Sequence, residues 1–415
     1  MISSFAKVHS LNKTRHNLLT EINKTNSLIA VIPILLVMQF GYSEMAFSNI
    51  TIEAGLDYSI MGEGVCIFDY NNDGLEDIFV CDRYDGQHLL FKNNGNMSFS
   101  EESDNAGINN TSEGRLAISA DYNHDGYLDL FIGAYSNNSI LYKNNGDGTF
   151  SDVSSQTGIN VPNDVEGGAW CDFNRDGWID LYVGRLRFAN VLYQNNGDGT
   201  FTDVAYQKNA TGPTSGGLVM GLTFIDFDAD GDDDIFITRD GFQGNILLRM
   251  DANHMYTDVS INAGVALPVM GMGAAVGDYD RNGIFDIYTT NLNENSLLYN
   301  NGDGTFSDLA DSAGVEDLPG SMAWGTFFFD ADNDGWLDIY NNNQSGFGNI
   351  PNSLFHNQGN GVFLDVADSL GIDSWNNGIG SAYGDLDNDG DLDFVLAGHS
   401  SDEGSILLFE NTSTP

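Results

Sequence analysis

The stretch Asp69-Tyr70-Asn71-Asn72-Asp73-Gly74-Leu75-Glu76-Asp77 decides the fold of this 415-residue chain. It has the pattern D-x-[DN]-x-[DN]-G-x-x-D. One such Asx- and Gly-rich stretch would indicate only a surface turn. The pattern returns at intervals of 51 to 55 residues, and a fixed period of this length is typical of repeat architectures. The further copies begin at Asp121, Asp172, Asp226, Asp278, Asp330 and Asp385.

The residues that follow each copy predict a β-strand. The first continuation reads DIFVCD (residues 77–82), and most of the others are similarly rich in β-branched and aromatic residues, which favour strands. An EF-hand would instead require a Glu at loop position 12. That position is occupied by Val80, Ile132, Val183, Ile237, Thr289, Asn341 and Leu396. The pattern therefore indicates a calcium loop between two strands.

Two more strands complete each repeat. An apolar segment such as SILYKN (139–144) is followed in three repeats by Asn-Asn-Gly-Asp-Gly-Thr-Phe, at 144–150, 195–201 and 300–306. Gly and Asn tolerate the positive φ of tight hairpins, and the Phe opens a fourth strand. Four short strands repeated seven times predict an all-β fold, a seven-bladed β-propeller with a calcium-binding loop in each blade.

The first strand of the mature chain is expected to close the ring. The seventh repeat ends in SILLFENTSTP (405–415), without a fourth strand of its own. Near the other end, residues 47–56 (FSNITIEAGL) match residues 256–265 (YTDVSINAGV) almost residue for residue. We therefore expect the N-terminal strand to complete the last blade, which leaves few exposed sheet edges.

The spacing within the pattern predicts a metal site in every copy. Positions 1, 3 and 5 point inward, Gly at position 6 permits the bend, position 7 offers its carbonyl, and a carboxylate at position 9 completes the shell. Ca²⁺ takes about 6 to 8 oxygen ligands, whereas Mg²⁺ seldom uses all-protein cages. We expect about seven Ca²⁺ ions. The candidate ligands are Asp69, Asn71, Asp73, Leu75, Asp77; Asp121, Asn123, Asp125, Tyr127, Asp129; Asp172, Asn174, Asp176, Trp178, Asp180; Asp226, Asp228, Asp230, Asp232, Asp234; Asp278, Asp280, Asn282, Ile284, Asp286; Asp330, Asp332, Asp334, Trp336, Asp338; and Asp385, Asp387, Asp389, Asp391, Asp393.

With this motif and its period, the chain from residue 47 onward resembles the VCBS and FG-GAP repeat family. That family includes the propellers of integrin α-subunits and of cartilage acidic protein-like proteins. The resemblance implies a seven-bladed propeller with calcium in loops on one face, and a role in extracellular adhesion or ligand binding. Function transfers between members of a fold only by analogy.

Residues 1–43 are expected to be a signal peptide, and residues 44–415 the propeller. The apolar run 27–40 (SLIAVIPILLVMQF) follows four basic residues and contains Pro33. It is shorter than the roughly 18 apolar residues that a membrane-spanning helix needs. Cleavage after Ser43 would give a protein that is secreted, periplasmic or held at the cell surface, without membrane insertion. The alternative is an uncleaved membrane anchor.

The composition is strongly acidic, with 60 Asp and Glu against 15 Lys and Arg and a formal net charge of −45. This excludes ordinary nucleic-acid binding, which requires clustered basic residues. The hydrophobic fraction of 41% also excludes an acidic disordered chain. Three cysteines are too few for a disulfide framework, and we expect them to be small buried side chains.

Antiparallel strands place the calcium loops on one face and the more variable loops on the other. Loops on a rigid scaffold commonly carry function, and Arg beside an aromatic ring suits carboxylate or glycan recognition. The alternative is salt-bridged surface residues. The candidate ligand-binding residues are Arg83, Arg185, Arg187, Arg239, Phe242 and Trp375, with Tyr84, Tyr135, Phe188 and Phe347 in the same loops.

A second candidate set lies at the starts of the first strands. It contains Glu63, Glu113 and Glu166, each before Gly, together with Trp170 and Trp324. The alternative for the tryptophans is packing near the central channel, since aromatic side chains are commonly buried.

The favoured function is a non-enzymatic adhesion or interaction scaffold for an extracellular protein or glycan. The chain has seven His and neither a His-Glu-x-x-His nor a Gly-x-Ser-x-Gly motif, so catalysis has weak support. The alternative is a glycan-directed propeller, either a lectin or a polysaccharide lyase. A buried His or Tyr constellation on the variable face would favour the lyase.

Overall fold

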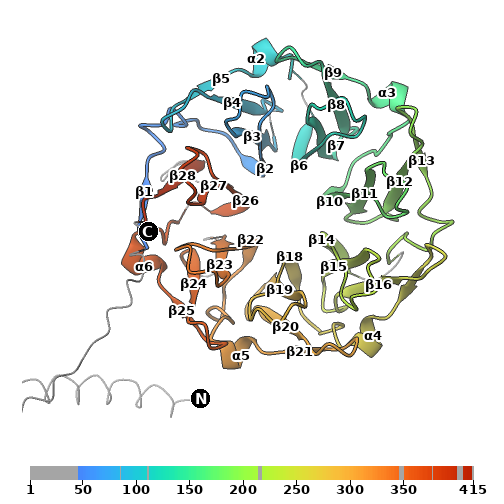
Figure 1. Ribbon diagram of the computed structural model, residues 1–415, viewed down its shortest axis with the longest axis vertical. Helices are drawn as coiled ribbons and strands as arrows, with labels where there is room; N and C mark the ends of the chain where they lie inside the picture. The colour runs from blue at the N-terminus through green and yellow to red at the C-terminus, as the bar shows by residue number, and fades with distance from the viewer. Residues whose placement is uncertain are drawn as a thin grey trace, which may run out of the picture. The chain divides into compact units, whose positions relative to one another are not determined.

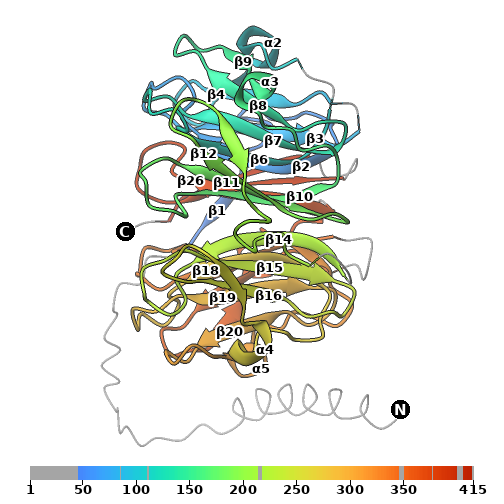
Figure 2. The same cartoon turned by 90° about the vertical axis from the view of Figure 1, so that its right-hand side faces the viewer.

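The computed structural model describes residues 45–84, 86–109, 112–213, 217–344, 350–375, 377–399 and 405–413. These residues form a ring of seven four-stranded antiparallel sheets, which confirms the predicted propeller (Figure 1). Figure 2 views the ring from the side on which β10–β12 and β14–β16 lie. In each blade the first strand lies nearest the axis and the fourth lies at the rim.

The strands of the first four blades are β2 Gly62–Phe68, β3 Asp77–Asp82, β4 Leu89–Asn93, β5 Phe99–Glu101; β6 Glu113–Ala120, β7 Asp129–Ser136, β8 Ile140–Asn144, β9 Phe150–Asp152; β10 Val165–Cys171, β11 Asp180–Arg185, β12 Val191–Asn195, β13 Phe201–Asp203; and β14 Leu218–Ile225, β15 Asp234–Asp240, β16 Ile246–Met250, β17 Tyr256–Asp258.

The strands of the last three blades are β18 Gly271–Gly277, β19 Asp286–Asn291, β20 Ser296–Asn300, β21 Phe306–Asp308; β22 Ala323–Phe329, β23 Asp338–Asn343, β24 Ser353–Asn357, β25 Phe363–Asp365; and β26 Gly378–Gly384, β27 Asp393–Gly398, β28 Ile406–Asn411, with β1 Phe47–Asn49. One-turn helices follow five of the fourth strands, namely α2 Ser103–Ala106, α3 Ser154–Thr157, α4 Ser260–Ala263, α5 Ala310–Ala313 and α6 Ala367–Leu370.

The N-terminal strand closes the ring as predicted. In the seventh sheet, whose order is β1-β28-β27-β26, β1 pairs antiparallel with β28 and sets Phe47 opposite Asn411. The Phe47 ring lies 5.3 Å from that of Phe394. The two ends of the propeller sequence are therefore joined by one ladder within a single blade.

The apolar core is divided among the spaces between neighbouring blades. In the described part of the chain, seven clusters of buried side chains each combine residues from two adjacent blades. The second strands are nearly fully buried; β3 and β19, for example, have no exposed residue. Their Val, Ile, Phe and Tyr side chains suit a strand that is covered on both faces. The free cysteines, Cys66, Cys81 and Cys171, are buried as expected.

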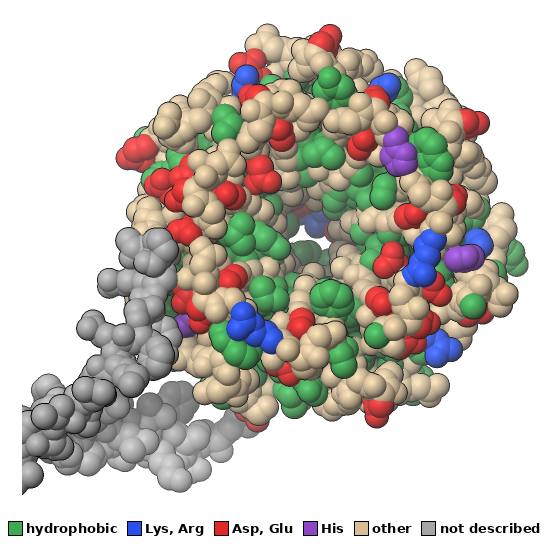
Figure 3. Space-filling view, viewed as in Figure 1, with side chains coloured by type: hydrophobic (Ala, Val, Ile, Leu, Met, Phe, Trp, Pro, Cys, Tyr) green, Lys and Arg blue, Asp and Glu red, His purple; other side chains and the backbone are tan. Residues whose placement is uncertain are grey.

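The inner strands are rich in Gly because they converge on the axis. A Cβ at Gly380 would collide with the carbonyl oxygen of Glu63 in the next blade, and one at Gly273 with that of Trp324. Glycine thus permits backbones to approach where a side chain could not fit. An opening remains on the axis, and a Lys or Arg side chain is visible within it (Figure 3).

A repeated pair of hydrogen bonds joins neighbouring blades through the Asn that ends the third strand. Asn144 donates from Nδ2 to the carbonyl of Tyr70 in the preceding blade, at 2.7 Å, and to that of Leu128 in its own blade, at 3.0 Å. The equivalent residues Asn93, Asn195, Asn300, Asn357 and Asn411 make the same pair of contacts. The fourth blade has Met250 at this position.

We expect Asn144→Ala to destabilise the protein by about 1–3 kcal/mol, because it leaves two buried carbonyls without this donor. The adjacent Asn145 is exposed, and its side chain bonds to the Thr149 and Ser151 side chains of its own hairpin, so Asn145→Ala is the matched control. Urea unfolding of both variants measures the difference. Equal stabilities would contradict a stabilising role for the hydrogen bonds that Asn144 makes between the blades.

Candidate metal centres

The start of each repeated loop is fixed by local hydrogen bonds. Asp69 accepts the N–H of Asp73 at Oδ1 (3.1 Å) and the N–H of Gly74 at Oδ2 (2.8 Å). Gly74 has φ +85°, which glycine adopts without strain. The position-1 carboxylate accepts the N–H of the position-6 Gly in every loop. The loop is thus wound around its first carboxylate.

Position 9 places a buried carboxylate under each loop. Asp129 accepts the N–H of Asn144 at Oδ1 (2.8 Å) and that of Tyr122 at Oδ2 (3.3 Å). Burial raises the pKa of Asp129 to about 7, with the negative charge of Asp125 adding to the effect. Burial likewise raises the pKa to about 7 for Asp77, Asp180, Asp286 and Asp393, and to about 8 for Asp234.

The loops bring together carboxylate oxygens that lack other partners. Oxygens from three acidic residues lie within 4.8 Å of one another in four loops: Asp226, Asp228 and Asp230; Asp278, Asp280 and Asp286; Asp330, Asp332 and Asp334; and Asp385, Asp387 and Asp389. Four buried oxygens, Oδ2 of Asp180 and Asp286 and Oδ1 of Asp226 and Asp228, accept no hydrogen bond in the described structure. An all-oxygen donor set with unsatisfied carboxylates fits a hard divalent cation such as Ca²⁺.

Position 7 contributes its N–H to the loop itself. In all seven copies this N–H donates to the side chain at position 5; Leu75, for example, donates to Asp73 at 3.1 Å. The carbonyls of Leu75, Tyr127, Trp178, Asp232, Ile284, Trp336 and Asp391 remain candidate ligands.

The loops are not equivalent, since the third strand does not bring the same kind of side chain to all of them. Lys92 Nζ lies 3.5 Å from Asp73 Oδ2 in the first blade, and Lys143 Nζ lies 3.2 Å from Asp125 Oδ2 in the second. In the seventh blade the corresponding residue is Glu410, whose pKa is raised by burial and by Asp387 and Asp389. The loop pattern alone does not predict these neighbours, because they lie 18 to 23 residues after the loop residues that they approach.

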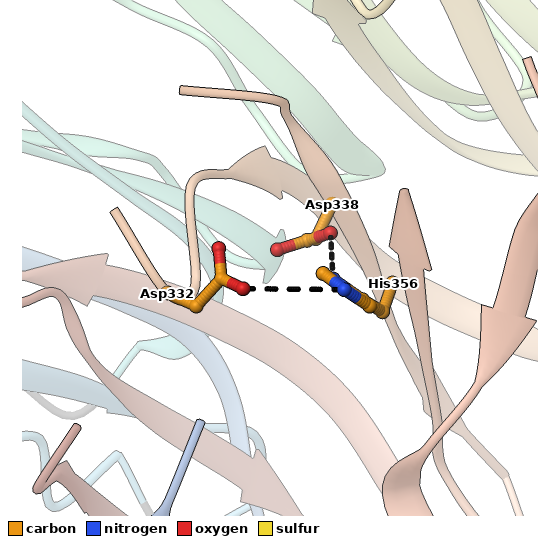
Figure 4. Close-up of side chains that lie close together, drawn as sticks. All are labelled: Asp332, Asp338 and His356. Carbon is orange, nitrogen blue, oxygen red and sulfur yellow. Dashed lines mark hydrogen bonds and ion pairs between the residues drawn. The ribbon is translucent and has the colours of Figure 1, made fainter. Parts of the chain in front are cut away.

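The sixth loop has a histidine beside its carboxylates (Figure 4). His356, on β24, lies with Nδ1 3.0 Å from Asp338 Oδ1 and Nε2 3.9 Å from Asp332 Oδ2. The hydrogen bond to Asp338 raises the pKa of His356, while burial raises the pKa of Asp332 to about 6. When protonated, this imidazole would partly neutralise the charge of the loop.

The residue at position 4 links several of the loops to the next blade, although the fourth loop has Ala229 there. Asn72 Nδ2 donates to the Gly126 carbonyl at 2.9 Å, and Arg175 lies 3.3 Å from Asp232. The His124 ring stacks on Trp178 in the next loop, with centroids 4.4 Å apart. Ordering one loop is therefore coupled to the position of its neighbour.

We expect the stability of the metal-free protein to fall as pH rises from about 4 to about 7. Five position-9 carboxyls, those of Asp77, Asp129, Asp180, Asp286 and Asp393, have native pKa values of about 7, and that of Asp234 about 8, against an ordinary 3.8. The native state therefore binds more protons between these values, and its stabilisation is lost as pH passes the native pKa. Calcium requires the ionised form, so the added Ca²⁺ stabilisation should grow over the same interval. Thermal melts in EDTA and in Ca²⁺ at pH 5 and pH 8 measure both trends.

The control for this pH dependence is a change of one buried carboxyl. Asp129→Asn should flatten the slope in EDTA, whereas Asp152→Asn, at an exposed position on β9, should leave it unchanged. Equal slopes for the two variants would show that general charge repulsion, rather than the position-9 carboxyls, causes the trend.

The candidate ligand-binding residues lie on the opposite face but do not form one site. Arg239 is used within its own loop, donating to the carbonyls of Gly244 and Gln243. Phe242 is 61% exposed in the fourth blade, and Trp375 is 37% exposed between α6 and β26. Phe347 and residues 1–43 lie outside the described residues.

Three of the candidate arginines lie in the first three blades. Arg83 pairs with Glu63, and Arg187 lies 3.4 Å from Asp164 Oδ1. Arg185 donates to the Pro162 carbonyl at 2.8 Å, and its guanidinium lies 4.5 Å from the Phe188 ring centroid.

The second candidate set divides between the channel and the core. Glu63, Glu166 and Trp324 line the axial channel, whereas Trp170 packs against Phe131 and Phe201. Glu113 does not occupy the position equivalent to Glu63 and Glu166. That position is held by Arg115. The Glu-before-Gly criterion selected Glu113, two residues too early, whereas counting six residues back from the loop Asp121, as from Asp69 to Glu63, would have found Arg115.

Five overlapping matches to the FG-GAP-like repeat cover residues 69–132, 121–183, 172–237, 226–289 and 278–341. The chain belongs to the FG-GAP-like repeat family. This agrees with the resemblance seen in the motif and its period. The matches begin at five of the loop aspartates described above.

Curated relatives match part of the chain. Cartilage acidic protein 1 of Xenopus tropicalis is 25% identical over 276 residues, which cover 61% of this chain and 42% of the relative. The Mus musculus protein of that name is 28% identical over 211 residues, covering 47% of this chain and 31% of the relative. The match thus spans less than half of these relatives.

A solved structure, BBS1N in complex with ARL6DN, has a similar fold. It aligns with a TM-score of 0.54 at 10% identity and covers 88% of this chain and 96% of that one. At this identity the likeness concerns the fold alone.

Proposed function

We propose that the protein is a secreted calcium-binding propeller that acts as an extracellular interaction scaffold. The observation that carries this proposal is the repeated loop. Seven copies of one oxygen-rich turn collect carboxylates on one face of a rigid ring, and several of their buried oxygens lack partners. About seven Ca²⁺ ions bound there would fix the loops and lower the negative charge.

The proposed location is outside the cytoplasm. Residues 1–43 would serve as a signal peptide and residues 44–415 would form the mature propeller. None of the described helices is long and apolar enough to cross a membrane. An extracellular or periplasmic setting would also supply the calcium that the loops require.

The ligand would bind on the face opposite the metal loops. That face presents exposed aromatic rings, including Tyr84, Phe188 and Phe242, beside arginines. Such pairs recognise carboxylates and sugars, which favours a protein or glycan partner. No catalytic role is proposed. The second candidate, a glycan-directed propeller, is favoured by the contact between Arg185 and Phe188.

Binding to arrays of extracellular proteins and of glycans tests the proposal. Residues 44–415 would be probed in Ca²⁺ and in EDTA, alongside Arg185→Ala/Arg187→Ala. The double variant should lose most binding. Arg175→Ala/Arg281→Ala, on the metal face, is the matched control and should retain it. Full binding by the Arg185/Arg187 variant would refute the placement of the ligand on the opposite face.

A further inference from the structure

The seven inner strands present one equivalent residue each to the axial channel. Each strand has a register irregularity at or next to this residue, and β-bulges re-aim side chains. The channel segment that they line has a volume of about 250 Å³. We call these residues the collar; they are Glu63, Arg115, Glu166, Met220, Met272, Trp324 and Ile379.

The collar is charged on one side and apolar on the other. Its first three members are Glu63, Arg115 and Glu166, whose side chains are only 1%, 9% and 3% exposed. Buried charges are costly even when paired. Because four blades fill the same position with Met, Trp or Ile, the fold itself does not need charge there. The charged half therefore calls for a functional explanation.

Donors and acceptors alternate through this charged half. Arg115 Nε lies 2.6 Å from Glu63 Oε2, and the same guanidinium pairs with Glu166. Arg83 pairs with the other oxygen of Glu63, and His399 Nε2 lies 3.5 Å from it. Each carboxylate is thus flanked by nitrogen atoms at the channel wall.

An aromatic ring holds the basic groups in place. The guanidinium carbons of Arg83 and Arg115 lie 5.2 and 5.1 Å from the centroid of the Tyr135 ring. Arg187 Nη2 lies 3.4 Å from the Tyr135 hydroxyl. Beside them Tyr84 is 56% exposed and contacts Arg83 at 5.2 Å. The charged half thus adjoins an open aromatic face.

We propose that the charged half of the collar, with Arg83, Tyr84 and Tyr135, binds a sugar residue of an uncharged saccharide. Sugar hydroxyls both donate and accept, so neighbouring hydroxyls match neighbouring guanidinium and carboxylate groups. The exposed Tyr84 ring offers an apolar surface for a sugar face. This inference rests on the proposed interaction function and names its ligand class and site.

The charge balance favours an uncharged ligand over an anionic one. Arg83, Arg115 and Arg187 are matched by Glu63, Glu166 and Asp164 in the contacts of this region. The chain as a whole carries a net charge of −45, which repels anions at long range. A uronate would therefore gain little from these arginines.

Saturation-transfer NMR with simple glycosides tests the inference. The probes are the methyl glycosides of glucose, galactose, mannose and N-acetylglucosamine, with methyl glucuronide as the anionic comparison, all in Ca²⁺. At least one uncharged glycoside should show transfer and exceed the glucuronide. Transfer from none of the four, or stronger binding of the glucuronide, would overturn the proposal.

The decisive variant is Glu63→Met/Arg115→Met/Glu166→Met, which copies the Met220 and Met272 side of the collar. Replacement of a buried ion triad by apolar residues often preserves or raises stability, so the variant should fold and lose binding at least tenfold. Lys92→Met on the metal face should bind normally. Retained binding in the triple variant would refute the site.

A second variant and a melting experiment distinguish a failed site from a failed fold and from the metal proposal. If the triple variant does not fold, Tyr84→Ala at the exposed rim should weaken binding at least threefold, and unchanged binding would refute the role of that ring. Thermal melts of the same samples in EDTA and in Ca²⁺ measure the stabilisation by calcium independently of saccharide binding. An absent calcium response with intact saccharide binding would count against the metal proposal alone.

Discussion

Excess EDTA is expected to lower the melting temperature of the propeller by about 10 °C or more, and added Ca²⁺ to restore it. A ligand present at 100 times its Kd stabilises the native state by about 2.7 kcal/mol per site, and the chain offers seven loops. Without cations, the clustered carboxylates of loops such as Asp226, Asp228 and Asp230 repel one another. Differential scanning calorimetry measures the shift.

A single loop provides the control. Asp226→Asn/Asp228→Asn should reduce the calcium-dependent rise in melting temperature by about the contribution of one of the seven sites. Asp147→Asn, in a hairpin, should leave that rise unchanged. Mg²⁺ at the same concentration should restore much less, because it dehydrates reluctantly. A melting temperature that does not change in EDTA would contradict the metal proposal.

Deletion of residues 44–56 is expected to open the ring, lower the melting temperature by about 10 °C or more and cause self-association. The deletion removes β1 and the contact of Phe47 with Phe394. It also removes the buried side chains of Ala54 and Leu56, which are 1% and 0% exposed. Each large buried apolar side chain contributes about 1.5–3 kcal/mol, and the bare β28 edge becomes available for intermolecular pairing.

A point variant separates the contribution of packing from that of the ladder. Phe47→Ala should lower stability by about 2 kcal/mol, less than the value for a fully buried Phe because this side chain is only partly buried. Ser48→Ala, at the exposed neighbouring position, should change it little. Light scattering and melting curves of the deletion, Phe47→Ala and Ser48→Ala measure self-association and stability. A deletion variant that stays monomeric with an unchanged melting temperature would contradict closure by β1.

The repeat, the strands and the closure could all be predicted because their causes are local or periodic. Asp69 accepts hydrogen bonds from the N–H groups four and five residues ahead, so one short segment of sequence determines the conformation of the loop. Most second strands, such as β3 (DIFVCD), are covered on both faces and therefore read as apolar runs, although β19 and β23 also bury Thr or Asn side chains. The closing strand was recognisable because residues 47–56 copy a segment whose place within a repeat was already known.

The sequence by itself determined a ring of seven blades with seven acidic loops, whereas only the tertiary structure decided how the charges of the axial collar are arranged. Glu63, Arg115 and Glu166 are about fifty residues apart, and their contacts exist only once the ring has closed. The register of β6 is irregular beside Arg115, and such irregularities re-aim side chains. His356 likewise reaches Asp338 from another strand. Local hydrogen bonds within a loop can be predicted from the spacing of its residues. Contacts between inner strands that meet at the axis can be seen only in the folded ring.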